Sequence, residues 1–404
     1  MPGCTLADAQ SVVGHGALPG VGINLTVVSS RTIAGWTVGS ATAGFEPRGV
    51  EIDANGASVA EIAVAPTTGR TVEIGRVSAA AGTDGVVRLV SDRRFRDDHG
   101  EYVECGTFRG QVARLTDEGQ YEDEGAAIHF DMASCRSVVA AERPFVMGTY
   151  PASDEDLFSG IVYQHAQWWG APSGQFARLW SYAQSQDVFD QGIPWLRALA
   201  LDAPAEPVGV ALPGGGLAVA WRHRGAVYLQ WLGADLTPRG APRVISTRSM
   251  QPGLPQLAVN GTDVVALFAQ RAGVHARSAV YAVRLPLNGN ALPHIVLAQG
   301  PEDAFAPSAV AIGTDGWAVT WSQSGGQARR GVATPGARVW LRMFDRTLRP
   351  VGDAQLVSEH ASDSRIAGFA SGQVVVTAMG GDAGERDVLT RSARCAGRDA
   401  AAPP

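Results

Sequence analysis

The sequence predicts an all-β protein built from repeated four-stranded sheets, and two observations carry this prediction. Of its 404 residues, 49 are Gly and 23 are Pro, which interrupt helices and favour turns. Short apolar runs separated by polar turns recur along the chain at a spacing of about 50 residues. The hydrophobic content of 45% is enough for a large core, so the composition argues against disorder.

The clearest repeat is a hairpin whose turn contains Gly-Thr-Asp. It occurs at residues 82–84, 261–263 and 313–315, and a Gly-rich turn at 213–216 takes its place in a fourth copy. Gly and Asp accept the positive φ that a short hairpin turn requires. A third and a fourth strand with alternating apolar and polar residues follow, as at 339–345. The repeating unit is therefore four short antiparallel strands.

Counting first strands gives seven such units. A sheet that is apolar on both faces needs a neighbour on each face, and a closed ring of sheets provides one. We therefore predict a seven-bladed β-propeller of four-stranded antiparallel blades over residues 1–395. The alternatives are six or eight blades, because the third unit is irregular. The units begin near residues 22, 76, 136, 207, 255, 307 and 365.

The units over residues 207–358 resemble the repeats of bacterial secreted and cell-envelope β-propeller repeat proteins. The resemblance is weaker in the other units. Blades of that family carry no fixed catalytic residue, so the resemblance implies a fold and a secreted or envelope location but no catalytic group.

The last unit lacks a fourth strand, and the N-terminus is expected to supply it. Residues 7–13 resemble residues 352–357, which form the fourth strand of the preceding unit. Residues 5–13 would then close the ring as the outer strand of the last blade. Residues 396–404 are left as a flexible tail.

This closure brings Cys4 beside Cys395, and we predict a disulfide between them. By elimination Cys105 pairs with Cys135, although four cysteines allow three connectivities. Two disulfides favour an oxidising compartment and thus a secreted or envelope-exposed protein. The alternative for Cys4 is a lipid anchor, since Gly3-Cys4 is similar to the end of a lipoprotein cleavage box. A lipid on Cys4 would exclude its disulfide.

Charge and hydropathy exclude several classes of partner. The net charge is −6 and no basic tract occurs, so nucleic acid is not expected as a partner. No apolar run is long enough for a transmembrane helix. The first residues lack the basic and apolar regions of a signal peptide, which leaves a cytoplasmic location or a trimmed secreted protein.

No catalytic or metal-binding motif stands out. The sequence has no HExxH, no Gly-x-Ser-x-Gly and no P-loop, and no two of its eight histidines lie within five residues of each other. We therefore predict no cofactor. Acidic stretches at 92–104 and 117–124 are interpreted as solvated loops, with Ca²⁺ binding as the alternative.

The third unit is the longest, and its extra residues are rich in aromatics. Exposed aromatic side chains on a long loop suit stacking on sugar rings or packing against a protein. The alternative is that they fix the loop onto the propeller. The candidate binding residues are Tyr163, His165, Trp168, Trp169 and Trp180. Five other tryptophans are expected in the blade core: Trp36, Trp221, Trp317, Trp321 and Trp340.

The sequence thus favours a non-catalytic propeller that binds a protein partner or a glycan, or serves as a scaffold. The first alternative is a polysaccharide-active propeller enzyme, a hydrolase or a lyase, because such enzymes also use this fold. The second is a structural subunit of a surface assembly.

Overall fold

A computed structural model gives the structure of the chain. It describes residues 3–18, 22–28, 31–40, 44–62, 70–74, 77–81, 87–90, 92–97, 100–105, 113–115, 121–123, 134–140, 143–149, 166–170, 177–179, 205–213, 216–223, 225–233, 239–247, 252–273, 276–287, 291, 293–314, 316–325, 336–369, 372–381 and 386–396. Side chains are described within residues 3–62, at Val77 and within residues 208–396.

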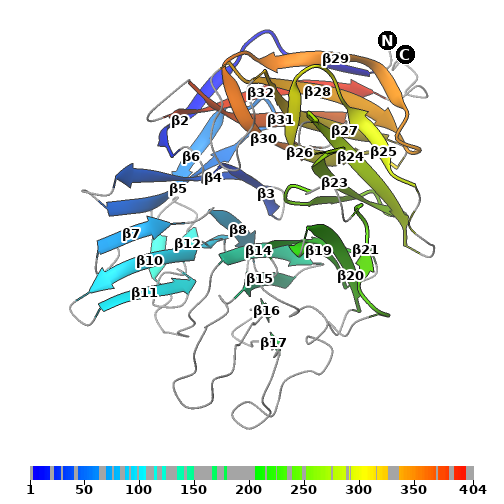
Figure 1. Cartoon of the computed structure of the whole chain (residues 1–404). Coiled ribbons are helices and arrows are strands. Elements are labelled where there is room, and N and C mark those ends of the chain that lie inside the picture. The colour runs from blue at the N-terminus through cyan, green and yellow to red at the C-terminus, as the bar shows by residue number, and fades with distance from the viewer. Residues whose placement is uncertain are drawn as a thin grey trace.

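Every element of the described chain is a β-strand, and five of its sheets have four strands paired in sequence order. These five sheets are the blades of a β-propeller (Figure 1). They are β3 (Asn24–Val28), β4 (Arg31–Ser40), β5 (Gly44–Ile52) and β6 (Ser58–Ile62); β14 (Ser134–Ala140), β15 (Arg143–Thr149), β16 (Ala166–Gly170) and β17 (Ala177–Leu179); β18 (Ala205–Ala211), β19 (Leu217–His223), β20 (Ala226–Leu232) and β21 (Arg243–Val244); β22 (Gln256–Val259), β23 (Asp263–Arg271), β24 (Ser278–Pro286) and β25 (Ile295–Ala298); and β26 (Asp303–Ile312), β27 (Gly316–Ser324), β28 (Arg338–Asp345) and β29 (Pro350–Ser358).

The remaining described strands form sheets of other sizes. The chain ends share a five-stranded sheet, and residues 70–123 form one three-stranded and two two-stranded sheets. The strands are β1 (Gly3–Leu6), β2 (Ser11–Ala17), β30 (Ala361–Gly368), β31 (Gln373–Gly380) and β32 (Arg386–Ala396) in the first; β7 (Arg70–Ile74), β10 (Asp92–Asp97) and β11 (Gly100–Cys105) in the second; and the pairs β8 (Ser78–Ala81) with β9 (Val87–Val90) and β12 (Ala113–Leu115) with β13 (Tyr121–Asp123).

The prediction of seven four-stranded blades is therefore wrong, and the propeller has five four-stranded blades in its described part. The prediction counted first strands, and a recurring first hairpin does not fix how many strands pair behind it. The described strands between residues 70 and 123 divide into smaller sheets. The chain-end sheet instead gains an extra strand, because two N-terminal strands pair with its edge.

The first strands of the sheets lie next to one another around a common centre (Figure 1). In order, β14, β18, β22, β26 and β30 contact one another, and β30 contacts β3. β8 contacts both β3 and β14, which completes the circle. Each of these first strands thus has a neighbouring first strand on both sides.

Burial along the second strands shows the effect of this packing. β23, β27 and β31 are buried along almost their whole length. In a sheet with one face exposed to solvent, buried and exposed residues would alternate along each strand. The described core is accordingly divided into separate apolar layers between adjacent sheets. The core prediction for tryptophans is confirmed: four are buried, and Trp340 packs against a buried layer. The four are Trp36, Trp221, Trp317 and Trp321.

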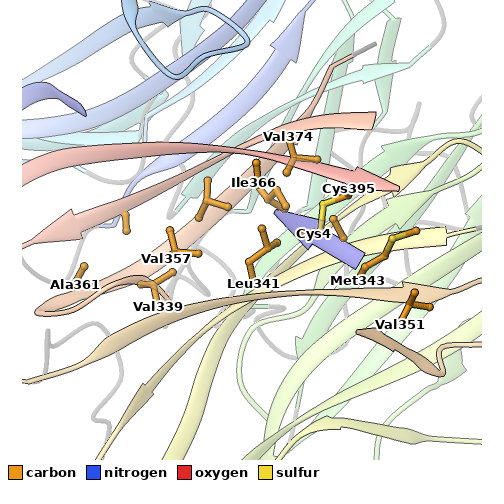
Figure 2. Close-up of a cluster of buried hydrophobic side chains, with 14 residues drawn as sticks. Cys4, Val339, Leu341, Met343, Val351, Val357, Ala361, Ile366, Val374 and Cys395 are labelled. Atoms are coloured by element: carbon orange, nitrogen blue, oxygen red, sulfur yellow. A yellow bond between two sulfur atoms is a disulfide. The ribbon is translucent and has the colours of Figure 1, made fainter. Parts of the chain in front are cut away.

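The two chain ends meet in the five-stranded sheet. β1 and β2 both pair antiparallel with β32, along the edge that β31 leaves open. The register places Cys4 opposite Cys395, and the predicted disulfide joins them. Both cysteines are buried in an apolar layer with Met343 and Val351 (Figure 2).

The N-terminal segment also touches the sheets on both sides of the closure. β1 contacts β28 and β29, whereas β2 contacts β4 and β5. The turn between β5 and β6 adds a polar contact, because Gln373 donates a 2.6 Å hydrogen bond to the carbonyl of Ala54 and Thr390 donates one to that of Gly56. The last sheet is therefore fixed to its neighbours by a covalent bond, apolar packing and turn contacts.

We predict that the double substitution Cys4→Ser/Cys395→Ser lowers the free energy of unfolding by about 4–5 kcal/mol. The two residues are 391 positions apart, so the bond restricts almost the whole unfolded chain. Denaturant unfolding of the oxidised protein and of the variant measures the difference, and reduced wild-type protein serves as the control. Equal stability, or alkylation of Cys4 in the untreated protein, would contradict the prediction.

Candidate functional site

The ends of the blades differ, and we name them by their strands. The turn end carries the turns after β22, β26 and β30, and the start end is where these strands begin. A Cβ at Gly368 would lie 2.8 Å from Val310, and one at Gly372 would lie 3.9 Å from Ile312. The C-terminal ends of β26 and β30 are thus neighbours, so both strands begin at the opposite end of the propeller.

Asp263 organises the turn end. Its carboxylate accepts a 2.9 Å hydrogen bond from Nε of Arg346 and one of 3.0 Å from Thr262, and it lies 3.2 Å from Nε of Arg284. Asn260 caps the same turn and donates to the carbonyl of Thr314 in the next blade. Arg346 also belongs to that next blade, following β28. The network therefore ties two adjacent blades together.

The environment of Asp263 keeps it ionised. Burial by itself raises the pKa of this carboxyl group, which is 1% exposed, but the interactions with Arg346, Arg284 and Thr262 outweigh that effect and lower the pKa. The sequence analysis placed Asp263 in a hairpin turn, because Asp accepts the positive φ that such a turn requires. In the structure it is the first residue of β23 and links two blades, whereas Gly261 takes the positive φ of 91°. One oxygen accepts the hydrogen bonds from Arg346 and Thr262, and the other faces Arg284 as an ion pair without a hydrogen bond. Because these contacts join two blades, we assign this end a structural role.

The start end has the more irregular backbone. The register of the first hairpin shifts near the beginning of β18, β26 and β30. Ala306 and Asp363 have φ of 47° and 52°, and His360 has 55°. Three of the four non-glycine residues with positive φ in the described ranges lie here. Bulges and such backbone positions are enriched at functional sites, where they re-aim side chains.

A buried carboxylate anchors two arginines at the start end. Asp303, which is 1% exposed, accepts a 2.6 Å hydrogen bond from the backbone N–H of Ser278 in the preceding blade. Its other oxygen faces Arg271 at 3.6 Å and Arg277 at 3.5 Å. The two arginine side chains are 28% and 43% exposed. A fixed negative charge thus holds two partly exposed guanidinium groups at the junction of two blades.

Glu302 lies beside this group, immediately before β26. Its carboxylate pairs with Arg338, and the Arg338 guanidinium lies over the ring of Trp340 at 5.8 Å. The Glu302 side chain is 25% exposed. A carboxyl group, a guanidinium group and an aromatic ring therefore lie together at the edge of the same blade.

Asp363 is an acidic residue near the start of β30. It accepts a 3.0 Å hydrogen bond from the backbone N–H of Ile23 and lies 3.3 Å from Arg365. Because Ile23 precedes β3, this contact links the chain-end sheet to the first blade. Asp363 keeps a partly exposed side chain at the start of a first strand.

These residues offer carboxylates for proton transfer and guanidinium groups for anions. Within the described ranges, no group of three or more His, Cys, Asp or Glu is arranged to hold a metal ion. None of the described segments is a helix long and apolar enough to span a membrane.

The predicted aromatic site falls largely outside the described residues. Tyr163, His165 and Trp180 lie there, as do the side chains of Trp168 and Trp169. The backbone of Trp168 and Trp169 belongs to β16, a paired strand where the sequence analysis expected a loop. Binding by these five residues stays a prediction.

The second predicted disulfide stays a prediction as well. Cys105 ends β11 and Cys135 lies in β14, and their side chains are outside the described part. The same holds for the side chains of the acidic stretches 92–104 and 117–124, so Ca²⁺ binding there is untested.

Sequence reasoning missed the start-end group because its members are far apart in the chain. Arg271 and Arg277 flank one hairpin loop, whereas Asp303 opens the first strand of the next blade. One available signal was position. Each of these charged residues stands at the boundary of an apolar strand, and boundaries at the same end of successive blades meet in a propeller.

Comparison with known proteins gave structural likeness alone. No protein-family model matches the sequence, and a search of curated proteins found no match. Among solved structures, the chain is similar to an α-L-arabinanase of Penicillium chrysogenum with arabinobiose, at 11% identity and a TM-score of 0.47, covering 83% of this chain and 97% of that one. The α-L-arabinofuranosidase Arb93A of Fusarium graminearum gives the same four values. A mutant sialidase of Trypanosoma rangeli is similar at 12% identity and a TM-score of 0.41, covering 85% of this chain and 56% of that one.

The prediction of a non-catalytic binding or scaffold propeller is corrected on this comparison. The three structures are named as an arabinanase, an arabinofuranosidase and a sialidase. At identities of 11–12%, the likeness carries no activity over to this chain.

We predict that Asp263→Asn lowers the free energy of unfolding by about 2–3 kcal/mol at neutral pH, because it leaves two arginines without their carboxylate. The lowered pKa adds a pH signature. The unfolded chain takes up the proton at higher pH, so the contribution is complete above the ordinary pKa near 3.8 and is lost as the pH falls through the folded-state value.

Denaturant midpoints of wild type and variant between pH 2 and pH 7 measure this effect. Glu46→Gln, which alters a solvent-exposed ion pair with Arg48, is the control. The difference in denaturant midpoint between wild type and Asp263→Asn should become smaller as the pH is lowered. A gap that stays constant over this range would refute the assigned role.

Proposed function

We propose that the chain is a polysaccharide-active propeller enzyme, a hydrolase or a lyase, that acts at the start end of its blades. The observation that carries this proposal is the pair of first strands β26 and β30. Each begins with an irregular backbone and has a partly exposed carboxylate paired with an arginine, Glu302 just before β26 and Asp363 within β30. Hydrolysis of a glycan needs positioned carboxyl groups that transfer a proton and stabilise a cationic transition state. Elimination needs a positioned base together with cations that stabilise the developing negative charge.

Glu302 and Asp363 are the two candidate carboxylates. Glu302 has the more exposed side chain, and the ring of Trp340 lies under its arginine partner. Aromatic rings beside carboxylates suit the apolar faces of sugars. We therefore assign Glu302 the primary role in proton transfer and Asp363 the role of a second acidic group.

The proposal includes a secreted or cell-envelope location in a bacterium, with a glycan as the partner. The Cys4–Cys395 disulfide supports an oxidising compartment. It also argues against the lipid anchor, because the Sγ of Cys4 is bonded to Cys395 and is not available to carry a thioether. No cofactor is part of the proposal, and Ca²⁺ is tested with a chelator.

We predict that Glu302→Gln reduces polysaccharide cleavage by about 10²- to 10⁴-fold while the protein stays folded. The assay follows new reducing ends and new unsaturated ends over a panel of arabinan, xylan, polygalacturonate and sulfated glycans. The two products distinguish hydrolysis from elimination. Asp363→Asn is measured in parallel.

The matched control is Glu61→Gln, because Glu61 also pairs with an arginine but lies exposed on the outer strand β6. Its activity should equal that of wild type. The proposal is wrong if the folded, oxidised protein cleaves none of these glycans, or if both start-end variants keep full activity.

A further inference from the structure

We propose that Arg271 and Arg277 form a binding site for an anionic group of a glycan, either a carboxylate or a sulfate. The inference rests on the proposed function and names the class of substrate for the same end of the propeller. It rests on the geometry around Asp303 and on the hydrogen-bonding capacity of the two guanidinium groups.

The two guanidinium groups have donors to spare. Asp303 offers them a single oxygen at 3.5–3.6 Å, beyond hydrogen-bond length, because its other oxygen accepts from the N–H of Ser278. Neither side chain donates a hydrogen bond to any residue in the described part of the chain. An arginine carries five N–H donors, so a ligand between them finds unused donors on both sides.

The charge balance at this point also favours an anion. Among the described residues, two guanidinium groups face the carboxylate of Asp303, so positive charge exceeds negative charge in this group, in a chain whose net charge is −6. The two like charges repel each other, and a bound anion would offset this repulsion. Planar anions with two oxygens bind arginine through paired hydrogen bonds, as carboxylates and oxyanions do.

The site is positioned in advance. Arg271 ends β23 and Arg277 immediately precedes β24, so one hairpin holds both arginines. Asp303 lies in the next blade and is fixed by the Ser278 N–H, while Ser278 Oγ donates to the carbonyl of Ala304. A ligand would therefore not need to order the two arginines from separate flexible segments, which lowers the entropic cost of binding.

The site lies beside the carboxylate of the proposed function. Glu302 immediately precedes Asp303 in the chain, so an anionic sugar held by the arginines would place its neighbouring glycosidic bonds near Glu302. Arg338 is engaged by Glu302 and is not part of the anion site. The arrangement assigns binding to Arg271 and Arg277 and chemistry to Glu302.

The test is calorimetric titration of the full-length oxidised protein with oligogalacturonate, dextran sulfate fragments and neutral dextran fragments. We expect Arg277→Gln and Arg271→Gln each to weaken binding of an acidic glycan by about 10- to 100-fold, the usual effect of losing a charged hydrogen bond. Arg349→Gln is the matched control, because Arg349 is exposed at the turn end of the neighbouring blade. It should change the affinity less than twofold.

The two acidic ligands separate the sources of the anion. Tighter binding of oligogalacturonate identifies a carboxylate sugar, and tighter binding of dextran sulfate identifies a sulfated one. Either result supports the site if it depends on both arginines. Equal affinity for neutral and acidic fragments, or unchanged affinity in both arginine variants, would overturn it.

Two further measurements distinguish loss of the anion site from misfolding of a variant and from failure of the proposed activity. Wild-type affinity should fall as NaCl is raised, which needs no variant, and no salt dependence would contradict the site. Arginine-dependent binding of an acidic glycan without cleavage of any polysaccharide would overturn the proposed function and support this site. If the protein cleaves only neutral glycans, and both arginine variants cleave them as fast as wild type, the proposed function is supported and the anion site is overturned.

Discussion

A sheet that is apolar on both faces is stable in water only when both faces are covered, and this constraint determines the architecture. The second strands β23, β27 and β31 are buried almost throughout, so each sheet depends on its two neighbours. In a linear stack the first and last sheets would each leave one face exposed. The circle removes that exposure, provided that the last sheet meets the first. The N-terminal strands on β32, with the Cys4–Cys395 bond, make this connection.

The same constraint moves charge to the ends of the blades. Because the faces are occupied by apolar layers, buried acidic groups such as Asp263 and Asp303 lie where strands begin or end, and each meets arginines of its own or a neighbouring blade. At the turn end, Asp263 pairs with an arginine of its own blade and one of the next blade, and so fastens the two blades. At the start end, Asp303 holds two arginines whose N–H donors are left for a ligand. The difference between these two networks separates a structural contact from a candidate site.

Several features of the fold were accessible from the sequence, because local patterns specify them. Gly261 and Gly313 occupy turns with positive φ, and three sequence repeats over 207–358 correspond to three four-stranded sheets. The disulfide was also accessible, since a missing fourth strand at one end matched a spare strand at the other. The number of four-stranded blades was not, because pairing depends on strands beyond the repeated hairpin, and residues 70–123 pair in smaller sheets. The start-end group was missed for a similar reason: Arg271 and Asp303 come together only when two blades pack.

Hydrogen exchange measured by mass spectrometry on the intact oxidised protein tests the closure most directly. If the N-terminal strands complete the last sheet, peptides covering residues 3–17 and 386–396 should be protected in the native protein. They should also lose protection together as denaturant is added, because they share one ladder of hydrogen bonds. Exchange of residues 3–17 at the rate of an unstructured chain, while residues 386–396 stay protected, would contradict this account of how the circle is closed.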